Sequence, residues 1–400
     1  MTTASELLVS IDDIGVDRAR GGFSRHVFDH AEQELREWFT EQARSRGLQV
    51  TTDGNANLWA WWGEPGTDAV VTGSHLDSVP GGGAFDGPLG VVSALAALDL
   101  LRAEGFTPRR PLAVAVFAEE EGGRFGVPCL GSRLLAGTID PDRARNLRDP
   151  DGVSFAEAMR SAGMAPERAG RDDVALDRIG HFVELHVEQG RGLIDLHRPV
   201  GVASSILSHG RWRFRFSGQG NHAGATPITD RRDPMLPASR LVLAAREAAF
   251  GTESARATAG RLVPTPGGTN VIASTVDVWL DVRSPADAAT RGLVDDLAGQ
   301  ADGYASEEGC RVEVTEESYA DTVHFDAGLR EELASLLDDA PMLPTGAGHD
   351  AGILAAHKPT AMLFVRNPTG VSHAPEEHAE SEDCDTGVVA LARTLEHLAS

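Results

Sequence analysis

Several short apolar runs of this chain are each followed directly by histidine or acidic side chains, and this pattern restricts the fold more than any other feature. Residues 69–72, 111–118, 180–186 and 360–365 consist mainly of apolar side chains without regular alternation. Runs of this kind predict strands that are buried on both faces of a sheet covered by helices. Because open α/β sheets carry their sites at the carboxyl ends of the strands, we expect a functional site at that edge.

The first run leads into residues 73–87, which place one histidine and two aspartates around a glycine turn. Residues 88–104 are expected to form a helix, because the initial proline is tolerated where its missing N–H has no partner. Alternation along a strand places His75 and Asp77 on one face. We therefore hypothesise that His75 and Asp86 bind a metal and that Asp77 fixes the tautomer of His75. Taken alone, the motif also fits an ordinary hydrogen-bonded loop histidine.

The other strand ends add further candidate ligands. Glu120 and Glu121 belong to three consecutive glutamates after residues 111–118. Such carboxylates repel one another and need cations, which a metal supplies, while a glutamate left uncoordinated can act as a general base. His186 and His373 each have an ordinary alternative, as a core histidine and an exposed loop histidine. Convergence of all these residues on one sheet edge favours a metal site.

The chain length of 400 residues favours two domains, or one domain with an insertion. Between residues 208 and 320 the pattern changes to alternating strands and amphipathic helices in the order strand, helix, strand, strand, helix, strand. This order is typical of a ferredoxin-like α+β module with one free sheet face. We therefore predict an inserted domain at 208–320 and a main α/β domain, with a mixed sheet covered by helices, formed by 1–207 and 321–400. The expected inserted strands are 210–217, 257–263, 275–282 and 310–315, and the expected helices are 234–250 and 286–306.

Composition excludes several classes of partner. The formal net charge of −24 argues against binding to nucleic acid, whose recognition depends on clustered Lys and Arg. A chain with 41% hydrophobic residues and no apolar run near about 20 residues is not expected to span a membrane. The three cysteines are odd in number and unclustered, and residues 1–15 do not read as a signal peptide. These features predict reduced thiols and a cytoplasmic protein.

Nearly the whole chain resembles the carbamoylase and allantoate amidohydrolase branch of the dinuclear metallopeptidase superfamily, together with β-ureidopropionases of the β-alanine synthase type. The motifs that carry the resemblance are GSHLDSVPGGGAFDGPLG, FAEEEGGRF, ELHVEQG, GNHAGATP, GAGHDA and GVSHAPEE. The resemblance implies a metallopeptidase-type catalytic domain, with the inserted domain serving as a dimerisation or lid domain. It also implies a cytoplasmic homodimer whose active site is completed across the interface.

Carried over residue by residue, the resemblance makes Asp86 the carboxylate that bridges two divalent metal ions. It assigns Glu121 and His373 to one metal, and His75 and His186 to the other. The ligand types suit Zn or Mn, and Co or Ni are also possible. The spacing of eleven residues between His75 and Asp86, with histidine at 186, resembles the amidase branch more than the peptidases.

The resemblance also implies roles outside the metal ligands. Glu120 matches the general base, Asp77 the acidic residue behind His75, and His222 a histidine that reaches the partner's active site and stabilises the oxyanion. The implied substrate contacts are Gln189, His222, Asn270, Arg283 and Gly348. Among them, Asn270 and Arg283 are implied to hold the substrate carboxylate from the second subunit. Arg283 suits a substrate carboxylate because its planar guanidinium binds two oxygens at once.

The expected activity is hydrolysis of the ureido or carbamoyl C–N bond of allantoate or an N-carbamoyl-L-amino acid, with release of ammonia and carbon dioxide. The alternatives are an N-acyl or N-formyl amino-acid deacylase or dipeptidase of the same superfamily, and a non-catalytic binder. This chain departs from many relatives at Arg366 and Asn367, close to the expected substrate position. An additional cation at Arg366 is expected to select a second anionic group.

Overall fold

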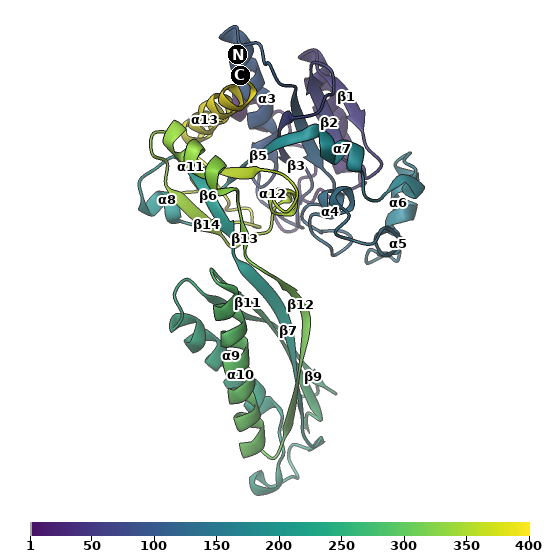
Figure 1. Cartoon of the computed structure of the whole chain (residues 1–400). Coiled ribbons are helices and arrows are strands. Elements are labelled where there is room, and N and C mark those ends of the chain that lie inside the picture. The colour runs from purple at the N-terminus through teal and green to yellow at the C-terminus, as the bar shows by residue number, and fades with distance from the viewer. Residues whose placement is uncertain (1) are drawn as a thin grey trace. The chain divides into compact units, whose positions relative to one another are not determined.

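The computed structural model describes residues 2–400, which divide into two compact units (Figure 1). Unit 1 contains the residues up to Ser205 together with His324–Ser400, and unit 2 contains Ile206–Val323. Unit 2 is therefore an insertion between two segments of unit 1.

Unit 1 is built on a mixed nine-stranded sheet with the order β1-β2-β4-β3-β5-β15-β6-β13, and β14 pairs with β6. The central strands β4, β3, β5 and β15 are parallel neighbours, whereas β2 and β6 run antiparallel to β4 and β15. The four parallel strands therefore present their carboxyl ends at one edge. The strands are β1 Gln49–Thr52, β2 Leu58–Trp62, β3 Ala69–His75, β4 Leu112–Phe117, β5 Ile179–Val187, β6 Val200–Ile206, β13 Val323–His324, β14 Met342–Thr345 and β15 Thr360–Val365.

Strands β3, β4 and β15 are buried at every position, which explains why their sequences lack alternation. Strand β3 continues past the expected residues 69–72, so His75 is its last residue. Gly73 makes this extension possible, because a Cβ atom there would lie 1.9 Å from the Ala115 carbonyl oxygen of β4. The mixed α/β architecture predicted from the apolar runs is confirmed.

The helices of unit 1 cover this sheet. Helix α3 packs on β3 and β5, and α1 and α13 pack on α3. The first turn of α3 begins directly after Asp86 and Gly87, at the carboxyl edge of the sheet. The helices of unit 1 are α1 Ala4–Val9, α2 His30–Ser45, α3 Pro88–Ala103, α4 Leu130–Ala136, α5 Pro141–Arg145, α6 Phe155–Ser161, the 3-10 helix η1 Pro166–Arg168, α7 Asp173–Arg178, α8 Gly192–Asp195, α11 Ala327–Leu336, α12 Asp350–Leu354 and α13 Ser381–Ala399.

Unit 2 is a four-stranded antiparallel sheet with the order β12-β7-β11-β9 and two helices on one face (Figure 1). Numbered within this sheet, the order is 4-1-3-2, the arrangement of a ferredoxin-like module. In β7, Trp212, Phe214 and Phe216 are buried and the intervening arginines face outward, as alternation predicts. The elements are β7 Ser208–Ser217, β8 Asn221–His222, η2 Ile228–Asp230, α9 Met235–Phe250, β9 Arg256–Thr265, β10 Val271–Ile272, β11 Thr275–Ser284, α10 Asp287–Glu307 and β12 Arg311–Ala320.

Among residues 2–400, no helix combines the length and apolar character needed to cross a membrane. Cys129, Cys310 and Cys384 are buried free thiols.

Candidate metal centre

The predicted ligands lie together at the carboxyl edge of the parallel strands. His75 ends β3, His186 lies near the end of β5, and Glu121 follows β4 closely. Asp86 precedes α3, and His373 lies in the segment after β15. All five side chains are brought together, although they come from segments up to nearly 300 residues apart in the sequence.

Asp86 lies at the centre of this group. Its Oδ1 atom is 3.2 Å from His186 Nε2 and 3.5 Å from His75 Nε2, and its Oδ2 atom is 3.4 Å from His373 Nε2. Glu121 Oε2 is 3.3 Å from the same nitrogen of His373. Two candidate ligand clusters therefore share one carboxylate: His75, Asp86 and His186 form the first, and Asp86, Glu121 and His373 form the second.

The two clusters differ in their access to solvent. The side chains of His75 and His186 are at most 1% exposed, whereas the side chain of His373 is 50% exposed. The first cluster is therefore closed, while the second faces solvent.

The tautomers of the buried histidines suit metal binding. His75 Nδ1 lies 2.9 Å from the Asp77 carbonyl oxygen, and His186 Nδ1 lies 2.9 Å from the Val187 carbonyl oxygen. A carbonyl can only accept, so each Nδ1 carries a proton, and in the neutral ring each Nε2 then has a lone pair that faces Asp86. Both Nε2 atoms are buried without a hydrogen-bond partner.

A lone pair facing a carboxylate is repulsive unless a cation, either a proton on Nε2 or a metal ion, lies between them. Metal–ligand bonds of about 2.0 Å at tetrahedral angles place ligand atoms about 3.3 Å apart. The distances of 3.2 and 3.5 Å from Asp86 Oδ1 to the two nitrogens match that spacing. The His, Asp and Glu donor set therefore fits two divalent ions.

The side chain of Asp77 has a different partner from the expected one. Its carboxylate is 3.8 Å from His75 Nδ1, and the main-chain carbonyl makes the hydrogen bond to His75 instead. The carboxylate accepts from the main-chain N–H groups of Glu120 and Glu121, both at 3.1 Å. Asp77 thus orients His75 through its backbone and holds the glutamate turn through its side chain.

The three consecutive glutamates have three different surroundings. Glu119 adopts a left-handed conformation, with φ of 54°, and accepts from the main-chain N–H groups of Arg124 and Phe125. Glu120 Oε2 lies 3.6 Å from His75 Nε2. Glu121 faces His373, so Glu120 is the glutamate beside the ligand clusters that belongs to neither of them.

Burial dominates the electrostatics of these acids. It raises the pKa of Glu121 to about 8, with the nearby charge of Asp86 adding to the effect. Burial also raises the pKa of Glu120 well above its usual range. For Asp86 burial acts in the same direction, but His186 and His75 outweigh it and hold its pKa well below the usual value. The site therefore places several carboxylates close together, and bound cations would stabilise their charged forms.

Two residues that sequence reasoning missed support Asp86. Glu377 Oε1 accepts from the main-chain N–H groups of Phe85 and Asp86, at 3.0 and 2.9 Å. Ser372 Oγ lies 3.0 Å from Asp86 Oδ2 and 3.1 Å from Glu377 Oε2, so its single hydroxyl proton lies between these two acceptors. Both residues lie in the GVSHAPEE motif, whose acidic end was the available signal.

Among the expected substrate contacts, Gln189 lies in the site, where its Nε2 atom donates to Asp86 Oδ2 at 2.8 Å. Gly348 is exposed in the loop before α12. The next residue, His349, is buried with its ring centroid 4.6 Å from that of His186, and a third candidate cluster joins both histidines to Glu184. Sequence reasoning selected Gly348 from the GAGHDA motif and missed the adjacent buried histidine.

In unit 2, the structure brings His222 and Asn270 together but separates Arg283 from them. The short ribbon of β8 and β10 pairs His222 with Val271, and the Ala223 N–H donates to the Asn270 carbonyl at 3.0 Å. Arg283 lies near the opposite end of β11, where it contacts both carboxylate oxygens of Asp281 at 2.6 and 3.0 Å.

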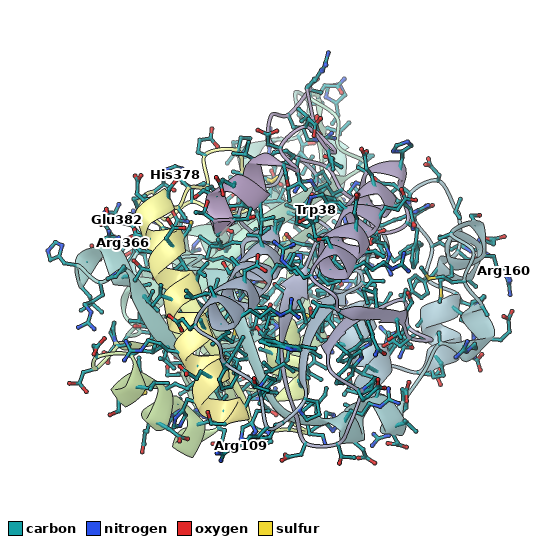
Figure 2. The ribbon with its side chains drawn as sticks, turned by 90° about the horizontal axis from the view of Figure 1, so that it is seen from above. Trp38, Arg109, Arg160, Arg366, His378 and Glu382 are labelled. Carbon is teal, nitrogen blue, oxygen red and sulfur yellow. The ribbon has the colours of Figure 1, made fainter. Side chains whose placement is uncertain are left out.

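Arg366 does not offer the additional free cation that was expected. Its guanidinium donates to both carboxylate oxygens of Asp383, at 2.8 and 2.9 Å, and Figure 2 shows it beside Glu382 at the start of α13. Asn367 instead organises the loop leading to His373, because its Oδ1 atom accepts from the N–H groups of Thr369 and Gly370.

The chain is similar to known proteins along nearly its whole length. Residues 71–397 match the model of peptidase family M20/M25/M40. The chain is 36% identical to the N-carbamoyl-L-amino acid amidohydrolase of Geobacillus stearothermophilus, over 98% of this chain and 97% of that protein. It is 31% identical to the allantoate amidohydrolase of Escherichia coli, over 98% of this chain and 97% of that protein.

A solved structure shares both units. The crystal structure of AtUAH in complex with glyoxylate superimposes with a TM-score of 0.85 at 31% identity, covering 100% of this chain and 98% of that one. Together, the sequence match over most of the chain and these relatives show that the chain belongs to peptidase family M20/M25/M40.

Proposed function

We propose that this chain is a two-metal amidohydrolase that cleaves the ureido or carbamoyl C–N bond of a small carboxylic acid, such as an N-carbamoyl-L-amino acid or allantoate. The observation that carries the proposal is the pair of ligand clusters sharing Asp86, with Glu120 beside them and in neither. The relatives named as amidohydrolases of these two substrates support the substrate class. The glyoxylate in AtUAH, a small carboxylate, is consistent with it.

His75 and His186 would hold one ion, Glu121 and His373 the other, and Asp86 both. Zn or Mn suits this donor set, and Co or Ni is compatible with it. Two such ions would polarise the ureido carbonyl and make a water molecule a better nucleophile at neutral pH.

Glu120 is placed to move the protons. Its Oε2 atom faces the ligand clusters, so it would accept a proton from the attacking water and return it to the leaving nitrogen. The C–N bond then breaks to give an amine and carbamate, which decomposes to carbon dioxide and ammonia. Asp77 supports this role by holding the backbone N–H groups of Glu120 and Glu121.

His222 is prepared to donate a hydrogen bond to an oxyanion. Its Nδ1 atom accepts from the main-chain N–H groups of Gly224 and Ala225, at 3.0 and 3.2 Å. Nδ1 therefore has no proton in the neutral ring, and Nε2 carries it. A fixed N–H donor of this kind stabilises the negative charge that develops on a carbonyl oxygen.

The positions of the unit 2 residues support a homodimer. Eight residue steps of about 3.4 Å each lead from Thr275 to Arg283, and the ribbon with His222 and Asn270 lies at the Thr275 end of β11. One small substrate cannot contact both groups from a single chain over about 27 Å. We propose that a second copy supplies His222 and Asn270, while Arg283 exchanges its contact with Asp281, a partly exposed acid, for the substrate carboxylate.

Unit 2 also has an apolar stripe suited to a second copy. Leu236, Leu243 and Phe250 repeat every seven residues along α9 and are 49%, 64% and 76% exposed. Residues with this spacing lie on one face of a helix, where a symmetric partner would cover them. We therefore propose that unit 2 is the dimerisation or lid domain.

We also propose that the enzyme is cytoplasmic, which is consistent with the three free thiols of the chain.

The proposed activity predicts ammonia release from ureido substrates. The purified metal-loaded protein should release ammonia from at least one of allantoate, 3-ureidopropionate and a set of N-carbamoyl-L-amino acids. Glu120→Gln should retain its metals and lose about 10² to 10⁴ in kcat, because the variant cannot accept the proton. Turnover of N-formylglutamate or dipeptides without release of ammonia would favour the deacylase or dipeptidase alternative. Full activity of the Glu120→Gln variant would exclude Glu120 as the general base.

Metal binding should stabilise the fold, because the ions relieve the crowded buried acids. At free metal concentrations about 100 times the Kd, the gain is about 2.7 kcal/mol per site, so chelation should lower the Tm by several degrees. Asp86→Asn should bind fewer than two ions and show a reduced Tm response to added metal. Equal Tm values for metal-free and metal-loaded protein would contradict the assignment.

The shared site predicts complementation between inactive subunits. Glu120→Gln and His222→Ala should each be inactive alone, but an exchanged heterodimer contains one intact site. Equal mixing should therefore restore about a quarter of the wild-type activity, since half of the dimers are mixed and each has one working site. Absence of recovery after subunit exchange is verified by mass spectrometry would rule out a site shared in this way.

A further inference from the structure

The thiol of Cys129 contacts the glutamate proposed as the general base. Cys129 Sγ lies 3.4 Å from Glu120 Oε1, within hydrogen-bonding distance for sulfur. Both side chains are buried, and Cys129 directly precedes α4.

The two carboxylate oxygens of Glu120 face different partners. Oε1 faces the Cys129 thiol, whereas Oε2 lies 3.6 Å from His75 Nε2 beside the first ligand cluster. Rotation of the carboxylate would exchange the two oxygens or move both of them away from the ligands. A donor at Oε1 therefore fixes the direction in which Oε2 points.

Backbone hydrogen bonds also connect Cys129 to Glu120. The Cys129 N–H donates to the Glu120 carbonyl at 2.6 Å, and the Leu130 N–H donates to the Glu119 carbonyl at 3.0 Å. Cys129 adopts a left-handed conformation, with φ of 55°, and Ser132 Oγ lies 3.1 Å from its carbonyl oxygen and 2.5 Å from Asp350 Oδ1. The start of α4 is thus attached to the glutamate turn, which limits movement of the thiol relative to the carboxylate.

The thiol is protonated in this environment. Burial raises the pKa of Cys129 well above its usual value, and the charges of Glu120 and Asp350 add to the effect. Cys129 therefore carries an S–H group that can donate to Glu120, rather than a reactive thiolate.

We propose that Cys129 is a positioning residue for Glu120, whose S–H donates to Oε1 and directs Oε2 toward the metal ligands. This inference rests on the proposed role of Glu120 as the general base. Loss of the donor should reduce the rate of the chemical step, while leaving metal binding and substrate affinity largely unchanged.

Three variants test the proposal on the metal-loaded enzyme. Cys129→Ala removes the donor and should lower kcat about tenfold, with KM within about twofold and two ions still bound per chain. Cys129→Ser supplies a hydroxyl donor and should recover most of that loss. Cys384→Ala removes a thiol that is also fully buried but lies in α13, so it measures the effect of a small cavity on the Tm and should leave kcat unchanged.

Infrared spectroscopy of the S–H stretch tests the contact without any turnover. The Cys129 band, identified by its loss in Cys129→Ala, should lie at lower frequency in the wild type than in Glu120→Ala, because hydrogen bonding weakens the S–H bond. An unmoved band overturns the proposal, as does wild-type kcat in Cys129→Ala or equal loss in the Ser and Ala variants. If no ureido substrate is turned over, the proposed function fails, while the infrared result still decides whether Cys129 donates to Glu120.

Discussion

The site depends on the placement of a single carboxylate, that of Asp86. Its Oδ1 atom faces two buried histidine nitrogens, and its Oδ2 atom faces His373. Two residues near the end of the chain hold this aspartate. Glu377 accepts from the main-chain N–H of Asp86, and Ser372 Oγ contacts Asp86 Oδ2. The parallel strands bring these segments to one edge, and the two clusters become a pair because they share Asp86.

Much of the centre could be predicted because it depends on regular structure. Apolar runs without alternation predicted buried parallel strands, and the ends of such strands meet at one edge. His75 and His186 lie in β3 and β5 themselves, so their convergence follows from the sheet alone. The family resemblance then supplied the bridging role of Asp86, with which the geometry of its two oxygens is consistent.

The contacts that escaped prediction depend on loop conformation. Glu119, Cys129 and His373 all have positive φ values, and hydrophobic periodicity contains no information about such turns. Consequently the partner of the Asp77 carboxylate and the contact of Cys129 with Glu120 could be found only from the structure. The GVSHAPEE motif pointed to Glu377 as an acidic residue, but not to its contact with the Asp86 N–H. The pairing of Arg366 with Asp383 likewise depends on where α13 begins.

The most direct test of this account is anomalous X-ray diffraction from crystals of the metal-loaded protein, measured on both sides of the absorption edge of the metal. The account predicts two anomalous peaks, one between His75 and His186 and one between Glu121 and His373, with Asp86 contributing one oxygen to each. A single peak, or peaks that do not share Asp86, would contradict it.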